Sequence, residues 1–259
     1  MLNLMYITKR PEIARIAENA GVDWIFVDME FIGKDSRQGG LDTVQNHHTV
    51  EDVANIKAVV SKAKVLVRVN PIHDTMENYP SSEDEINAVI HAGADIIMLP
   101  FFKTVSEVNR FIDAVGGRAK VCLLVETPEA ASLLEQIVKI QGIDMIHLGL
   151  NDMHLALKMK FMFQLLADGS VDKWTDIISK KGIKFGFGGL ASLDGGVIPP
   201  DFVIVSPKKY KSSNISWQEC KKSGLFSYRG SSLLFYPSFC ASPNATRIIL
   251  DYQAFTSMS

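Results

Sequence analysis

Two acidic residues, Glu126 and Asp152, each follow a short apolar run in the middle of the chain. The runs, residues 121–125 and 143–148, are rich in leucine and β-branched residues, which is typical of parallel strands buried on both faces. In a barrel of such strands, catalytic residues lie at the C-terminal ends, so we expect both carboxylates at one rim. Two carboxylates there predict an oxygen site for a divalent cation, which would keep several waters and take its other ligands from the substrate.

Arg68 and two histidines, His47 and His48, are further candidates for chemistry. Arg68 lies near the end of the apolar run 64–69, where a charged side chain indicates a partner or a ligand. The histidines end the segment 31–48, which is longer than the roughly 12 residues that compact domains usually leave without secondary structure. This length indicates a segment that binds or covers something.

Strands, helices and glycines alternate along the chain at intervals of roughly 25 to 30 residues, the period of repeated βα units. Strands are predicted at residues 2–7, 22–28, 64–69, 94–99, 121–125, 143–148, 184–187 and 201–205. Helices are predicted at residues 11–20, 50–60, 83–92, 105–115, 152–166 and 171–181, with another helix starting at Thr127-Pro128. The pattern predicts an α/β fold, a (β/α)8 TIM barrel that forms the catalytic domain over residues 1–206. Residues 207–259 show no clear period, and we interpret them as a divergent C-terminal extension that is not a separate domain.

Composition narrows the class of protein. The chain has 259 residues, a length that suits one α/β barrel, and its 47% hydrophobic and 22% charged residues are ordinary for a globular protein. A net charge of −2, without a basic run, argues against a nucleic-acid surface. No stretch reaches the roughly 18 apolar residues of a membrane span, and no signal peptide is evident. We expect a cytoplasmic protein that does not bind membranes.

Five motifs stand out along the chain: DWIFVDME at 23–30, VRVN at 67–70, GADIIMLP at 93–100, VETPEA at 125–130 and LGLND at 148–152. Together they resemble one known family, that of the HpcH/HpaI aldolases and citrate lyase β-subunits. Their order and spacing match the family over about residues 2 to 205. The resemblance implies a TIM barrel of the phosphoenolpyruvate/pyruvate type.

The resemblance also implies an activity and a role for each matched residue. The aldolase branch of the family cleaves 4-hydroxy-2-oxo acids to pyruvate, or a close relative, and an aldehyde. Glu126 and Asp152 would hold Mg²⁺ or Mn²⁺, and Arg68 would contact the 2-oxo oxygen and the carboxylate of the substrate. The amides from Gly149 through Leu150 and Asn151 to Asp152 would bind the substrate carboxylate.

The chemistry of such a cleavage fits these residue types. Breaking a carbon–carbon bond beside a ketone leaves an enolate, so a Lewis-acidic metal and a guanidinium would stabilise the oxygen that becomes negative. The planar fork of Arg68 suits a carboxylate and an enolate oxygen better than a lysine would. A base must also accept the proton of the 4-hydroxyl, and the candidates are His47, His48 or a metal-bound hydroxide.

The chain departs from the family at two positions. Phe31 occupies the place of a histidine that aldolase members commonly carry, and Leu124 that of a glutamine. Two alternatives therefore stay open: a citrate-lyase-like or malyl-CoA-lyase-like cleavage of a CoA thioester, and a barrel without catalysis that acts as a binding or assembly subunit. In the preferred interpretation, the partners are a small 2-oxo acid and further copies of the chain in a homo-oligomer.

Overall fold

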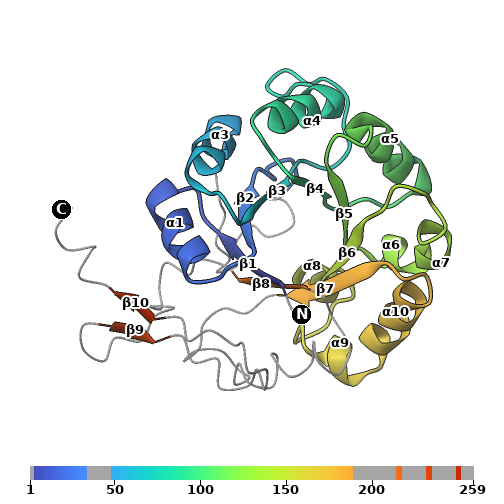
Figure 1. The fold of residues 1–259 in the computed structure, drawn as a ribbon. Coiled ribbons are helices and arrows are strands. Elements are labelled where there is room, and N and C mark those ends of the chain that lie inside the picture. Colours follow the sequence, from blue (N-terminus) through green and yellow to red (C-terminus); the bar gives the residue numbers. More distant parts are fainter. Residues whose placement is uncertain (1–2, 34–47, 189–213, 218–231, 235–248, 252–259) are drawn as a thin grey trace.

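A computed structural model describes residues 3–33, 48–188, 214–217, 232–234 and 249–251, with only the backbone described beyond 188. Eight parallel strands form a closed barrel in the order in which they occur along the chain (Figure 1). They are β1 Asn3–Ile7, β2 Trp24–Asp28, β3 Lys64–Arg68, β4 Ile96–Leu99, β5 Lys120–Val125, β6 Met145–Gly149, β7 Lys184–Gly188 and β8 Asn214–Trp217. The predicted TIM barrel is confirmed. Strands β9 Ser232–Leu234 and β10 Ile249–Asp251 form a separate antiparallel pair.

Helices surround the barrel on its outer side (Figure 1). They are α1 Pro11–Asn19, α3 Val50–Val59, α4 Ser82–His91, α5 Val105–Val115, α6 Pro128–Ser132, α7 Leu134–Ile137, α8 Leu150–Ala156, α9 Gln164–Ala167 and α10 Ser170–Ser179. Threonine N-caps start several of them, because the threonine oxygen accepts a hydrogen bond from a backbone N–H of the first turn. Thr49 and Asp52 form a capping box at α3, and Thr127 caps α6 as predicted.

The core has two layers, one inside the barrel and one between the strands and the helices. The interior layer consists of Met5, Ile7, Trp24, Phe26, Leu66, Ile96, Met98, Cys122, Leu124 and Met145. Since side chains alternate between the two faces of a strand, the residue two positions after an interior one also faces inward. On four strands that next interior residue is polar: Asp28, Arg68 and Glu126 lie at or just after the C-terminal end of their strands, and His147 lies in the middle of β6. The fold thus places Asp28, Arg68 and Glu126 together at one end of the barrel interior, with His147 one layer below them.

A repeated Gly-X-Asp sequence ties pairs of strands together at the opposite, N-terminal end. It precedes β2, β4 and β6. Each aspartate accepts a hydrogen bond from a backbone N–H of the preceding strand: Asp23 from Leu4 at 2.8 Å, Asp95 from Val65 at 2.9 Å and Asp144 from Val121 at 2.8 Å. The glycines have positive φ angles of 89°, 99° and 91°, which only glycine adopts at little cost.

Replacing Asp95 with alanine is expected to lower the free energy of unfolding by about 1–3 kcal/mol, because the buried Val65 amide would lose its acceptor. Asp95 also pairs with Lys57 at 2.7 Å. Asp95→Asn keeps an oxygen for the amide but removes the charge, so it should retain most of the stability. Urea unfolding of both variants separates the two contributions; equal losses would show that the ion pair matters more than the amide bond.

Two predicted boundaries differ from the structure in the C-terminal half. The barrel is closed by β8, which lies beyond the predicted end at Ser206, whereas the predicted strand at 201–205 lies outside the described residues. The predicted helix 152–166 was wrong: α8 starts at Leu150 and ends at Ala156. It ends there because Lys158 adopts a left-handed conformation with φ of 54°. Asp152 is therefore the third residue of α8 and not its N-cap.

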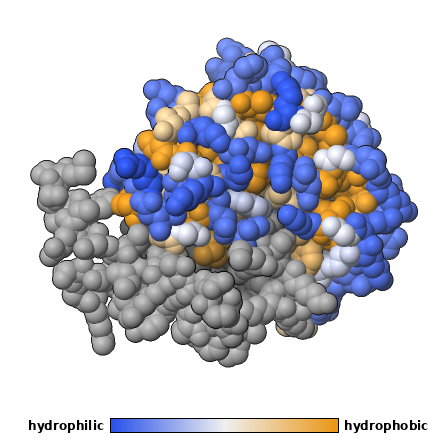
Figure 2. Space-filling model, viewed as in Figure 1, coloured by the Kyte–Doolittle hydropathy of each residue, from blue (hydrophilic) through white to orange (hydrophobic). Residues whose placement is uncertain are grey.

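The outer surface mixes polar and apolar residues. Figure 2 shows hydrophilic residues over much of the face in view, with hydrophobic residues between them. Within the described ranges, no helix has both the length and the apolar character that crossing a membrane requires.

Candidate active site

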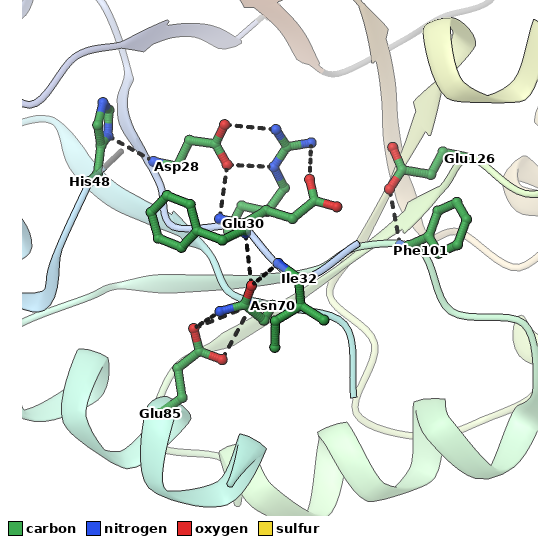
Figure 3. Close-up of polar contacts among 10 residues, drawn as sticks. Asp28, Glu30, Ile32, His48, Asn70, Glu85, Phe101 and Glu126 are labelled. Carbon is green, nitrogen blue, oxygen red and sulfur yellow. Dashed lines mark hydrogen bonds and ion pairs between the residues drawn. The ribbon is translucent and has the colours of Figure 1, made fainter. Parts of the chain in front are cut away.

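The guanidinium of Arg68 is the centre of a buried polar cluster and pairs with Asp28 and Glu30, which are labelled in Figure 3. Asp28 faces Arg68 from the neighbouring strand and binds it in a bidentate manner, with Nε–Oδ1 and Nη2–Oδ2 distances of 2.8 Å each. Glu30 Oε2 lies 3.2 Å from Nη1, and the Phe26 ring lies below the guanidinium with its centroid 5.6 Å away. The contacts with Asp28, Glu30 and Phe26 together leave the planar guanidinium little freedom to rotate.

The charge of Arg68 is stabilised by its surroundings. Burial alone would lower the pKa of Arg68, but the charges of Asp28, Glu30 and Glu126 raise that pKa well above its ordinary value. The side chain is 11% exposed, and the side chains of Asp28 and Glu30 are 1% and 3% exposed. The barrel therefore holds a permanent cation among carboxylates, away from bulk water.

The side chain of Glu126 occupies space that is free because Gly149, the last residue of the neighbouring strand β6, has no side chain. A β-carbon on Gly149 would lie 2.7 Å from Glu126 Cβ and 2.9 Å from its Oε2, closer than such contacts occur in proteins. Glu126 Oε1 accepts a hydrogen bond from the Phe101 amide at 3.0 Å. Phe101 has a φ of 48°, a strained conformation for a bulky residue. The hydrogen bond from the Phe101 amide and the absence of a side chain at Gly149 together set the position of the Glu126 carboxylate.

Asp152 lies at the same end of the barrel as Glu126. Glu126 follows β5, Asp152 lies in the first turn of the helix that follows β6, and these two strands are neighbours. Both carboxylates are thus at the rim where they were predicted. Among the described residues, no group of three or more His, Cys, Asp or Glu side chains is arranged to hold a metal ion. A cation site made of Glu126 and Asp152 alone stays a prediction.

A hydrogen-bonded chain fixes the segment that follows β2. The amides of Phe31 and Ile32 donate to Asn70 Oδ1 at 2.8 and 2.9 Å, and Asn70 Nδ2 donates to Glu85 Oε1 at 2.8 Å. Sequence reasoning gave Asn70 and Glu85 no role, although Asn70 belongs to the motif that contains Arg68. Burial raises the pKa of Glu85, while its hydrogen bonds from Asn70 act in the opposite direction.

The raised pKa of Glu85 predicts a pH dependence of stability. A carboxyl whose pKa is higher in the folded state contributes its full stability below the unfolded pKa, near 4.5, and loses it as the pH rises through the folded value. Glu85→Gln removes this loss and keeps an oxygen for Asn70. Relative to the wild type, the variant should therefore gain stability between pH 4.5 and pH 7.5. Urea unfolding at both pH values measures the difference, and a difference that does not change with pH would contradict the prediction.

His48 is buried and hydrogen-bonded within the cluster, whereas His47 lies outside the described residues. The amide of Asp28 donates to His48 Nδ1 at 2.9 Å (Figure 3). Nδ1 is therefore an acceptor, and in the neutral ring the hydrogen lies on Nε2. A proton added at Nδ1 would break this bond, so the geometry favours a role for His48 in positioning Asp28. Its predicted role as a base is not tested by this contact alone.

A profile described as HpcH/HpaI aldolase/citrate lyase matches residues 3–162, more than half of the chain. The chain belongs to this family. The match includes Arg68, Glu126 and Asp152, and it confirms the resemblance that the five motifs indicated. The HpcH/HpaI aldolase/citrate lyase family consists of carbon–carbon lyases, so this coarse class applies to the chain.

Solved structures of HpcH/HpaI-type proteins share the fold. An HpcH/HpaI aldolase from Desulfitobacterium hafniense DCB-2 has 14% identity and a TM-score of 0.65, over 84% of this chain and 86% of that chain. An aldolase/citrate lyase family protein from Burkholderia cenocepacia J2315 has 14% identity and a TM-score of 0.63, over 84% and 87%. Citrate synthase SbnG has 15% identity and a TM-score of 0.63, over 84% and 86%. A search of curated proteins found no match.

Proposed function

We propose that the protein is a divalent-metal-dependent class II aldolase, which cleaves 4-hydroxy-2-oxo acids to pyruvate, or a related 2-oxo acid, and an aldehyde. The observation that carries the proposal is the guanidinium of Arg68, fixed by Asp28 and Glu30 at the rim to which Glu126 belongs. A rigid cation beside a carboxylate suits a reaction that creates an enolate oxygen. Membership of a family of carbon–carbon lyases supports the same class of reaction.

Glu126 and Asp152 would hold Mg²⁺ or Mn²⁺. The fit rests on the donor set, because both ligands are carboxylates at one end of neighbouring strands, and Gly149 leaves room for Glu126. Hard divalent cations prefer oxygen ligands and often use only one or two protein carboxylates. The ion would supply positive charge at the 2-oxo oxygen as that oxygen becomes an enolate.

Residues of the chain would perform the remaining tasks. Arg68 would bind the carboxylate and the developing enolate oxygen, and Asp28 would keep the guanidinium plane in place during cleavage. The amides of Gly149, Leu150 and Asn151 would bind the substrate carboxylate. His47 or His48 would accept the 4-hydroxyl proton as the electron pair of the C3–C4 bond moves to the enolate, and protonation of the enolate at C3 would then give pyruvate. For His48, this step requires the ring to leave the Asp28 amide.

A screen for pyruvate release tests the proposal. The purified protein is expected to release pyruvate from 4-hydroxy-2-oxo acids of several chain lengths, to lose turnover with a chelator, and to regain it with Mg²⁺ or Mn²⁺. Release of free thiol from a malyl-CoA-type thioester, without turnover of 2-oxo acids, would favour the CoA-thioester alternative. Absence of turnover with both substrate classes would favour a binding or assembly subunit. Light scattering would test the homo-oligomer that we also propose.

A further inference from the structure

His147 lies inside the barrel, one layer below the rim. It is on β6, on the same face as the interior residue Met145, and it is 5% exposed. Its neighbours in register are Leu124 on β5 and Gly186 on β7. Phe185 and Phe187 pack into the outer core, so Gly186 between them faces the interior and places no side chain beside the imidazole.

The imidazole of His147 is not explained by the fold. Its Nδ1 is buried and has no hydrogen-bond partner in the described part of the chain. Leaving such a group unsatisfied costs about 1–3 kcal/mol, and other interior positions, such as Leu66, Met98 and Leu124, are apolar. A residue that lowers stability in a well-packed interior indicates a function that requires it.

Arg68 connects His147 with the candidate site. Burial, and to a smaller extent the charge of Arg68, lower the pKa of His147 to about 4. The imidazole is therefore neutral at pH 7 and presents one N–H donor and one acceptor nitrogen. Gly149, the next interior residue of β6, lies against Glu126, and Arg68 is the charged group that contributes to the lowered pKa of His147.

We propose that His147 is a further substrate-binding residue, whose Nδ1 forms a hydrogen bond with an oxygen of the 2-oxo acid bound at Arg68. The assignment rests on the proposed function and adds a contact from the barrel interior to those at the rim. The ligand oxygen supplies the partner that Nδ1 lacks. The neutral ring does this without adding a second buried cation beside Arg68.

Two substitutions separate a binding role from a structural one. His147→Leu fills the same interior with an apolar side chain, and it is expected to lower kcat/KM for pyruvate release by about 10- to 100-fold, the effect of losing one good hydrogen bond to a charged ligand. The melting temperature should stay equal or rise, because the unsatisfied nitrogen disappears. His147→Gln keeps a neutral polar group and should recover part of the activity. Met145→Leu, on the same face of β6, is the control and should leave kcat/KM unchanged.

A direct measurement adds a readout that does not depend on turnover. Oxalate, with Mg²⁺ present, should shift the imidazole ¹⁵N resonance of His147 and should bind more weakly to His147→Leu. Unchanged kcat/KM and oxalate affinity in His147→Leu would overturn the proposal. It would also be overturned if His147→Leu lost melting temperature and activity together and His147→Gln restored no activity. If the wild-type protein binds oxalate with the His147 shift but never releases pyruvate, the aldolase function is refuted, whereas the contact between His147 and the ligand is supported.

Discussion

Arg68→Lys is expected to lower kcat/KM for pyruvate release by about 10²- to 10³-fold, the usual effect of removing one preorganised donor from an oxyanion site. Lysine keeps the positive charge but cannot bind both oxygens of Asp28 and point a second edge toward the substrate. The charge would therefore remain while its orientation is lost. Steady-state kinetics with a 4-hydroxy-2-oxo acid measures the effect.

The same substitution is expected to lower the free energy of unfolding by about 1–3 kcal/mol. Asp28 and Glu30 are almost completely buried, and they would lose charged hydrogen bonds that water cannot replace there. Removing the cation entirely, as in Arg68→Ala, should cost more, about 3–5 kcal/mol, because buried carboxylates would remain without this partner. Urea unfolding of both variants gives the order, and equal losses would contradict the role of the buried charge.

Arg110→Lys is a matched control for Arg68→Lys. Arg110 also binds a carboxylate in a bidentate manner, with distances of 2.7 and 3.0 Å to Glu83, but both partners are more than one-third exposed. Exposed pairs contribute little, so the stability should change by less than about 1 kcal/mol and turnover should not change. A loss of turnover in Arg110→Lys as large as in Arg68→Lys would show that the effect at Arg68 is not specific to the site.

The sequence predicted the barrel because its signals are local and repeated. Apolar runs, capping threonines and glycines recur with each βα unit, and the structure has strands and helices at nearly every predicted place up to β7. The helix predicted at 152–166 failed for a local reason that the pattern cannot show. Apolar residues such as Met159 and Phe161 continue the helical spacing, but the chain turns at Lys158, which has a positive φ. A positive φ cannot be predicted from the presence of a lysine.

The site was predicted only in part, because its contacts depend on strand register. The position of Glu126, Asp152 and Arg68 at one rim could be predicted, since each ends or follows a strand and the strand order brings those ends together. The pairing of Asp28 with Arg68 needs the knowledge that these residues lie opposite each other on neighbouring strands. The bond between His48 and the Asp28 amide joins residues that are 20 positions apart, across a segment with no pattern. Such contacts leave no periodic signal in the sequence.

Glu126→Gln is expected to abolish turnover, with a loss of at least about 10³-fold, and to remove Mn²⁺ binding. The amide keeps an oxygen for the Phe101 N–H and has nearly the same size, so the packing against Gly149 should persist. What disappears is the negative charge of one of the two carboxylates that we propose as protein ligands of the divalent cation. Electron paramagnetic resonance titration with Mn²⁺ measures the binding, and circular dichroism checks the fold.

Glu129→Gln provides the control for Glu126→Gln. Glu129 lies three positions later in the first turn of α6, where it is half exposed and pairs with Lys103 at 3.4 Å. Its loss should leave both Mn²⁺ binding and turnover unchanged, because the charge lies in solvent, outside the barrel. If Glu126→Gln still binds Mn²⁺ as tightly as the wild type, the cation is held elsewhere. Glu126 would then serve only to fix the strained turn at Phe101.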